Sequence, residues 1–205
     1  AVDFNTRKDI HHRQGSFSWF HERDNGEGLL SLWQGDRDIE QFLPFAGDDT
    51  TSSGAVIDVS RQFEGAHARW RQRGVNWSAT VGAQLERQQD HRFGYVNDSG
   101  EKGDLRRNEF NWIENASAYL RFQWQLSEEL SATGGVRYSD INYEVEDYFT
   151  DLDNSDDSGS SDFSETTAAV SVTWQFLPTS ATYLSIGQGF ETPTLTELAY
   201  RNQGS

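Results

Sequence analysis

The sequence lacks cysteine and methionine, and it contains no long hydrophobic run. Without cysteine, the chain has no disulfide, thiolate metal site or thiol nucleophile. No apolar run approaches the roughly 20 residues that a transmembrane helix needs, which excludes a helical membrane protein. No Met starts the chain, and no signal-like series of charged, apolar and small residues opens it. We therefore expect a processed or internal segment.

Positive charge and hydrophobic residues are also scarce. Lys and Arg number 17 against 33 Asp and Glu, a net charge of -16, which disfavours nucleic acid as a partner. Hydrophobic types make up 35% of the chain, and the mean hydropathy is -0.77. Such values are compatible with a membrane β-barrel, because only alternate strand residues face lipid while the lumen face and the loops stay polar.

Apolar and polar residues alternate with a period of two along much of the chain, which predicts β-strands. One face of each segment is apolar and the other is polar. The apolar series are Trp77–Ala79–Val81–Ala83–Leu85, Ala116–Ala118–Leu120–Phe122–Trp124, Leu130–Ala132–Gly134–Val136–Tyr138 and Ala168–Val170–Val172–Trp174–Phe176. On the polar faces we expect Gln84, Glu86, Tyr119, Arg121 and Arg137 to line a lumen.

The links between these segments alternate between short and long, as they do in outer-membrane barrels. Short links at 22–28, 71–76, 125–129 and 177–180 predict periplasmic turns. Longer links at 43–54, 91–107 and 149–164, rich in Asp, Ser and Gly, predict extracellular loops. The fold class predicted is all-β, a transmembrane antiparallel up-and-down β-barrel, here a partial one of about eight strands. The strands are longer than the roughly 10 residues needed to cross a bilayer, so we expect them to project beyond its outer surface.

Tryptophan lies beside the short links, at Trp70, Trp77, Trp124 and Trp174. An indole ring has an apolar body and one polar N–H, which suits the headgroup region of a membrane. We therefore predict that these four residues lie at the membrane interface.

The C-terminal segment from Tyr183 to Arg201 carries a more specific signal. Gly-x-Gly-Phe is followed by Pro-Thr-Leu-x-Glu-Leu, and the matching residues are Gly187, Gly189, Phe190, Pro193, Thr194, Leu195, Glu197 and Leu198. This pattern resembles a signature of TonB-dependent outer-membrane receptors. Thr192 replaces the small residue that usually precedes the proline, and the segment from Gly135 to Asp140 is similar to another strand of that family.

The resemblance implies that residues 1–205 are an internal part of a 22-stranded barrel domain and that no plug domain is present. It implies uptake of a scarce ligand, such as a ferric siderophore or another metal chelate, through the bacterial outer membrane. The partners it implies are outer-membrane lipid, the metal-chelate ligand and the TonB complex, which would act through the missing plug. By the same resemblance, aromatic residues at the loop borders are candidate ligand contacts: Phe93, Tyr95, Phe110, Tyr148 and Phe163.

No pattern in the sequence points to an enzyme, a metal site or a cofactor. Neither Gly-x-Ser-x-Gly nor His-Glu-x-x-His occurs. The acidic run from Asp147 to Asp162 lacks the spacing of a calcium loop and is interpreted as a solvated loop. His11 and His12 are adjacent, so in a strand they point to opposite faces and cannot chelate one ion together.

Two other interpretations stay open. A complete small outer-membrane barrel, structural or a passive channel, would fold heat-resistantly in detergent. A soluble β-sandwich binding module would also alternate apolar and polar residues, and it would be monomeric without detergent. The abundance of Ala and Gly on the apolar faces and the recurrence of long acidic loops at one end favour the membrane barrel.

Overall fold

The computed structural model describes residues 3–49, 52–150 and 154–193. Within these ranges the chain forms one sheet of eight antiparallel strands, in the order in which they follow along the chain. The strands are β1 (Arg7–Arg23), β2 (Gly26–Phe42), β3 (Val56–Arg73), β4 (Trp77–Asp98), β5 (Glu101–Gln125), β6 (Leu130–Asp147), β7 (Gly159–Leu177) and β8 (Ser180–Gly187). Each strand pairs with the next, so the topology is up-and-down, as predicted. Among the described residues, no helix is long and apolar enough to cross a membrane.

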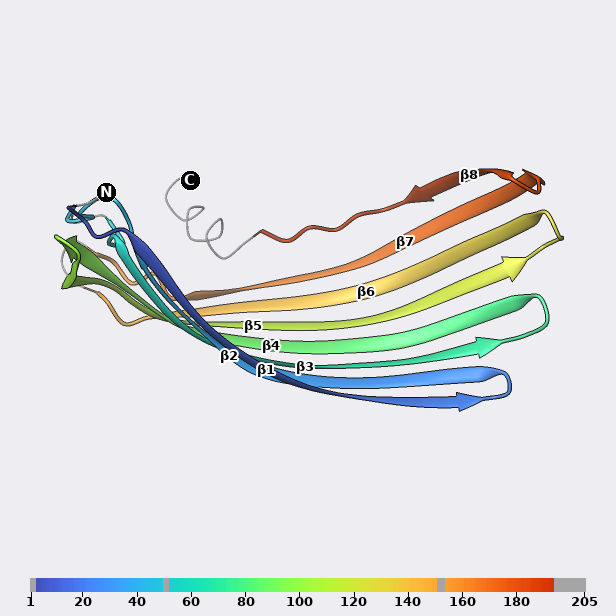
Figure 1. The fold of residues 1–205 in the computed structure, drawn as a ribbon, viewed down its shortest axis with the longest axis horizontal. Helices are drawn as coiled ribbons and strands as arrows, with labels where there is room; N and C mark the ends of the chain where they lie inside the picture. The colour runs from blue at the N-terminus through green and yellow to red at the C-terminus, as the bar shows by residue number, and fades with distance from the viewer. Residues whose placement is uncertain (1–2, 50–51, 151–153, 194–205) are drawn as a thin grey trace.

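The sheet is twisted, curved and open. The short turns gather at one end and the longer connections at the other (Figure 1). The turns at 24–25, 74–76, 126–129 and 178–179 confirm the four predicted short links. The first strand, β1, pairs only with β2, and the last, β8, pairs only with β7. Each edge strand of the described sheet therefore has one unpaired edge. A sheet edge exposed to hydrocarbon costs several kcal/mol per unsatisfied backbone group, so this sheet needs further strands if it is to lie in a membrane.

The predicted loop at 91–107 is wrong. Strand β4 continues to Asp98 and β5 begins at Glu101, so the two strands form a hairpin where a loop was expected. The turn between them uses positive φ at Ser99 (52°) and Gly100 (96°). Phe93 and Tyr95 do alternate with Arg92 and Gly94, but the segment is rich in charged residues, Gly, Asn and Asp. Gly, Asn and Asp are uncommon in strands, so the composition indicated a loop. The predicted loop at 149–164 is also shorter than expected, because β7 starts at Gly159.

The two faces of the sheet differ, and the register fixes which residues share each face. Leu85, Leu120 and Val136 lie on one face, which we call the outer face, and Tyr119 and Arg137 lie on the opposite, inner face. Outer-face residues are exposed, for example Leu85 at 59% and Leu120 at 49%. A soluble chain rarely exposes a contiguous apolar surface of this kind, so the outer face needs a nonpolar environment.

A small core lies at the end of the sheet with the long connections. It contains the buried residues Phe42, Ala55, Val56 and Val59. Asn97 is buried beside it, where its side-chain amide donates to the backbone oxygens of Phe4 and Leu43 and its Oδ1 accepts from the backbone N–H of Gly100. These bonds tie the start of β1, the link after β2 and the β4–β5 hairpin together.

Candidate functional site

On β3, β4 and β5, the apolar band of the outer face ends at one row of residues. On β6 it ends one row earlier, because Asp140 pairs with Ala116. Leu85 and Ala116 are directly paired in the last apolar row, whereas the next row toward the long connections pairs Glu64 with Arg87 and Arg87 with Glu114. Arg87 Nε lies 3.0 Å from Glu114 Oε1, and both side chains are more than half exposed. Charged groups of this kind need water, so the row marks the edge of the band.

The height of the band fits a bilayer. At about 3.3 Å per residue, the part of β5 from Ala116 to Trp124 covers about 20 Å of membrane height when the strand is tilted by about 40°. Outer-membrane barrels carry an apolar band of about 25 Å. A band of this height can span a bilayer with the row of charged residues at one of the two headgroup regions.

The predicted interface tryptophans all lie on the outer face, near the short turns. Trp77 pairs with Trp124, Trp70 pairs with Val81, and Trp174 pairs with Leu130. Trp77, Trp124 and Trp174 are 38%, 47% and 50% exposed. This position is the opposite end of the band from the charged row, and the assignment of these rings to a membrane interface stays a prediction.

The residues predicted to line a lumen all lie on the inner face. There they form hydrogen bonds across strands. Tyr119 Oη lies 3.2 Å from His67 Nε2, and Arg137 donates to Ser117 Oγ at 2.8 Å. Glu86 accepts a bond from Asn115 at 3.2 Å. Gln84 and Arg121 share this face, which is mostly polar from β3 to β7. On β1 and β2 it also carries Phe20, Leu29 and Trp33.

A cluster of arginines and carboxylates lies higher on the inner face, and sequence patterns did not reveal it. Arg61 donates two hydrogen bonds of 2.7 Å to the carboxylate of Asp90, whose side chain is only 4% exposed. Arg92 donates to Glu109 at 2.7 Å, and Arg107 lies 3.5 Å from the same carboxylate. The pairs come from β3, β4 and β5.

The cluster keeps unused hydrogen-bonding capacity. Arg37 lies in the same row as Arg61 and Asp90, and its buried Nε has no hydrogen-bond partner. Asn111, 1% exposed, donates to Glu109, but its buried Oδ1 has no partner. The four arginines Arg37, Arg61, Arg92 and Arg107 outnumber the three carboxylates on this part of the inner face, which are Asp90, Glu109 and Asp147. The cluster is therefore positive within a chain of net charge -16.

The link between β2 and β3 lies against the inner face above this cluster. A Cβ on Gly94 would lie 2.0 Å from the backbone oxygen of Ser53, so a larger residue at position 94 would push the link away. Ala55 N donates to Tyr95 O, and Gly54 takes a φ of 90° that favours glycine. The link thus narrows the space over the inner face at this end of the sheet.

The five aromatic residues predicted to contact ligand divide between the two faces. Phe93, Tyr95, Phe110 and Tyr148 lie on the outer face beyond the charged row, where Phe110 stacks on His91 with ring centroids 3.9 Å apart and meets Tyr148 at 6.0 Å. A hydrogen bond to Glu146 raises the pKa of Tyr148. Phe163 lies on the inner face, 6.0 Å from Tyr143.

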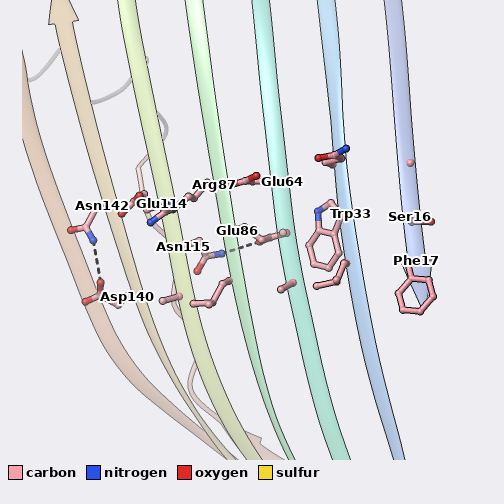
Figure 2. Close-up of a pocket in the computed structure, with 17 residues that line it drawn as sticks. Ser16, Phe17, Trp33, Glu64, Glu86, Arg87, Glu114, Asn115, Asp140 and Asn142 are labelled. Atoms are coloured by element: carbon pink, nitrogen blue, oxygen red, sulfur yellow. Dashed lines mark hydrogen bonds and ion pairs between the residues drawn. The ribbon is translucent and has the colours of Figure 1, made fainter. Parts of the chain in front are cut away.

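The outer face is hollowed along the charged row. The hollow has a volume of about 770 Å³, and its lining comes from strands β1 to β6. Figure 2 shows Asn142, Glu114, Arg87 and Glu64 in a line across neighbouring strands, with Phe17 at the opposite side of the hollow. The hollow thus spans the boundary between the apolar band and the charged row.

The motif at the C-terminal end of the sequence is described only in part. Gly187 ends β8, and Gln188 N donates to Ala168 O. Gly189, Phe190 and Pro193 follow without regular secondary structure. The motif residues Thr194, Leu195, Glu197 and Leu198 lie outside the described residues.

Comparison with known proteins gives one family and several similar folds. The family described as TonB dependent receptor-like, beta-barrel, matches residues 2–205. The fold is similar to the ferric-catecholate import receptor Fiu from E. coli K12, with a TM-score of 0.71, 11% identity, and coverage of 89% of this chain and 36% of that one. The fold is also similar to the ferric yersiniabactin uptake receptor FyuA from Yersinia pestis, with a TM-score of 0.69, 14% identity, and coverage of 88% of this chain and 28% of that one. For the ferric citrate transporter FecA, the TM-score is 0.73 and the identity 14%, and the match covers 88% of this chain and 27% of that one. The chain spans about a third of the length of these proteins.

Proposed function

Because the chain belongs to the TonB-dependent receptor family of β-barrels, we propose that it forms part of the barrel of a receptor that imports a metal chelate through the bacterial outer membrane. The observation that carries the proposal is the contrast between the two faces of one sheet. An exposed apolar band on the outer face suits lipid, and an inner face that is mostly polar from β3 to β7 suits a lumen. The chain is then no enzyme, since receptors of this family bind and transport their ligands.

The two other interpretations of the sequence are not favoured. A β-sandwich buries its apolar faces between two sheets, whereas the described residues form one sheet whose apolar face is exposed. A complete small barrel would pair its first strand with its last, whereas β1 and β8 are not paired with each other. We propose that the plug domain and the remaining barrel strands belong to the same receptor, and that the TonB complex acts through that plug.

The arginine cluster supports an anionic chelate as the ligand. Arginine binds carboxylates and other planar anions through paired N–H donors, and it stays charged when partly buried. Arg37 Nε is a buried donor without a partner, and an anion that accepts its hydrogen bond would remove the free-energy cost of leaving it unsatisfied. The cluster lies on the inner face below the β2–β3 link, which is where a ligand entering the barrel would pass.

The five predicted aromatic residues are additional candidate ligand contacts in this proposal. Phe163 faces the same side of the sheet as the arginine cluster and could contact an apolar or catechol part of a chelate. Phe93, Tyr95, Phe110 and Tyr148 would contact a ligand only from the rim of the barrel, before it enters. Replacement of each by Ala in the complete receptor tests this: unchanged ligand affinity would exclude the residue as a contact.

The import proposal is tested with the complete receptor in cells that depend on it for uptake of a radiolabelled ferric chelate. We expect Arg37→Ala to weaken binding of an anionic chelate about tenfold, the loss of one charge-assisted contact. Binding of a neutral chelate of the same size should change little. Arg23→Ala, on the outer face near a short turn, is the matched control. Receptor found in the inner-membrane or soluble fraction, or uptake that persists after a protonophore collapses the energy supply, would contradict the proposal.

A further inference from the structure

The hollow on the outer face continues into a second one, and together they form a trough that crosses the boundary of the apolar band. The second hollow has a volume of about 710 Å³ and shares Gly15, Gln34, Glu64, Arg87 and Glu114 with the first. Small residues leave this space open. Gly15 has no atom within 4 Å of the position that a Cβ would take, and Ala66 and Ala116 lie on the floor.

One end of the trough is apolar. Phe17, Leu32 and Leu85 line it and are 60%, 44% and 59% exposed. They belong to the same face as Leu120 and Val136 of the apolar band. The floor is therefore continuous with the surface that faces hydrocarbon, and an acyl chain of a lipid can lie along it.

The other end of the trough is polar and contains the half-buried indole of Trp112. A third hollow of about 280 Å³ is lined by Trp112, Glu114, Asn142, Glu144 and Glu146. An aromatic ring surrounded by carboxylate and amide oxygens fits a sugar ring, whose C–H groups lie on the indole while its hydroxyls donate to the oxygens.

The charges of the trough disfavour a phosphate headgroup. Both of its arginines are engaged by carboxylates: Arg87 by Glu114 at 3.0 Å and Arg13 by Asp36 at 3.1 Å. Further carboxylates line the walls at Glu64, Asp140 and Glu144. Carboxylates thus outnumber arginines, so a phosphate would meet a surface of like charge, whereas a hydroxyl-rich headgroup would find acceptors.

We propose that this trough is a binding site for one glycolipid of the outer leaflet, with an acyl chain on the apolar floor and an uncharged sugar headgroup beside Trp112 and Glu114. The proposal rests on the membrane placement in the proposed function, but it is independent of chelate import. It predicts that the receptor selects a sugar headgroup over a phosphate headgroup although both lipids offer the same acyl chains.

The test is native mass spectrometry of the complete receptor in detergent, titrated with glucosyl diacylglycerol or with phosphatidylglycerol of identical chains. We expect one glucosyl lipid to stay bound per receptor and to bind about tenfold more tightly than the phospholipid, a difference equal to one or two hydrogen bonds to charged acceptors. Trp112→Ala and Leu85→Ala should each lower glucosyl-lipid binding about fivefold or more, the loss expected for one aromatic or aliphatic contact.

Matched controls lie on the same face outside the trough. Trp174→Ala and Leu120→Ala remove the same residue types from the apolar band and should leave the lipid stoichiometry unchanged. Equal binding of the two lipids, or equal losses in trough and control variants, would overturn the proposal. A mass of two receptor copies that disappears with Leu85→Ala would also overturn it, because a second copy would then cover the trough. Chelate binding measured on the same variants separates this outcome from failure of the proposed function.

Discussion

Breaking the Arg61–Asp90 pair should destabilise the barrel by about 2–3 kcal/mol. Removal of one partner of a buried ion pair costs about 3–5 kcal/mol. The Asp90 side chain is 4% exposed but that of Arg61 is 33% exposed, so water reaches part of the pair and we expect less than the full cost. After Arg61→Ala, the carboxylate of Asp90 retains a weak bond from Gln88 Nε2 at 3.4 Å.

A double-mutant cycle isolates this interaction. The variants are Arg61→Ala, Asp90→Ala and the combination of both, and the assay is unfolding of the complete receptor by guanidinium chloride in detergent micelles, followed by tryptophan fluorescence. We expect a coupling free energy of about 2 kcal/mol between the two residues. The exposed pair Arg87–Glu114 is the control, with an expected coupling below about 0.5 kcal/mol. Additive losses at Arg61 and Asp90 would refute the reasoning, because a formed bidentate pair cannot give additive effects.

Three further predictions concern positions on different parts of the sheet. Val136→Arg should destabilise the folded barrel by about 2–4 kcal/mol in lipid vesicles, although the next residue, Arg137, is already an arginine on the inner face; an unchanged midpoint of urea unfolding would show that Val136 does not face lipid. Gly65→Ala should cost about 1–3 kcal/mol, because its Cβ would lie 2.2 Å from the ring of Trp33, and thermal unfolding should show a lower Tm. Asn97→Ala should raise proteolytic cleavage of the β2–β3 link about tenfold or more at native conditions, since it removes the three hydrogen bonds that hold the hairpin tip; cleavage at the unchanged rate would contradict this.

The strands in the apolar band were predictable from sequence because one face is apolar and the other mostly polar, which gives a period of two. Leu120 and Tyr119 alternate as the sequence suggests, and the observed register places them on opposite faces. Beyond the charged row, β4 and β5 are rich in charged residues, Gly, Asn and Asp, and the last three are uncommon in strands. For this reason the β4–β5 hairpin was not predicted from the sequence, although Asn97-Asp98-Ser99-Gly100 is a turn-forming sequence.

The arginine cluster could not be found from sequence for a different reason. Arg37, Arg61 and Asp90 come from three strands, and only the register between the strands places them in one row. A shift of one residue in any strand would turn its side chain to the other face. The same dependence on register divides the predicted aromatic contacts, with Phe163 on the inner face and Phe110 on the outer face.

The most direct test of the central claim is a cysteine scan of β5, since the chain contains no cysteine of its own. Single cysteines from Trp112 to Trp124 carry a nitroxide in the complete receptor, reconstituted in lipid vesicles, and collision with oxygen is compared with collision with a water-soluble nickel complex. We predict oxygen maxima at Ala116, Leu120 and the other even positions up to Trp124, nickel maxima at the odd positions, and loss of the oxygen maxima at Glu114. Accessibility to nickel that is equal at even and odd positions would contradict a lipid-facing band and, with it, the membrane-barrel account.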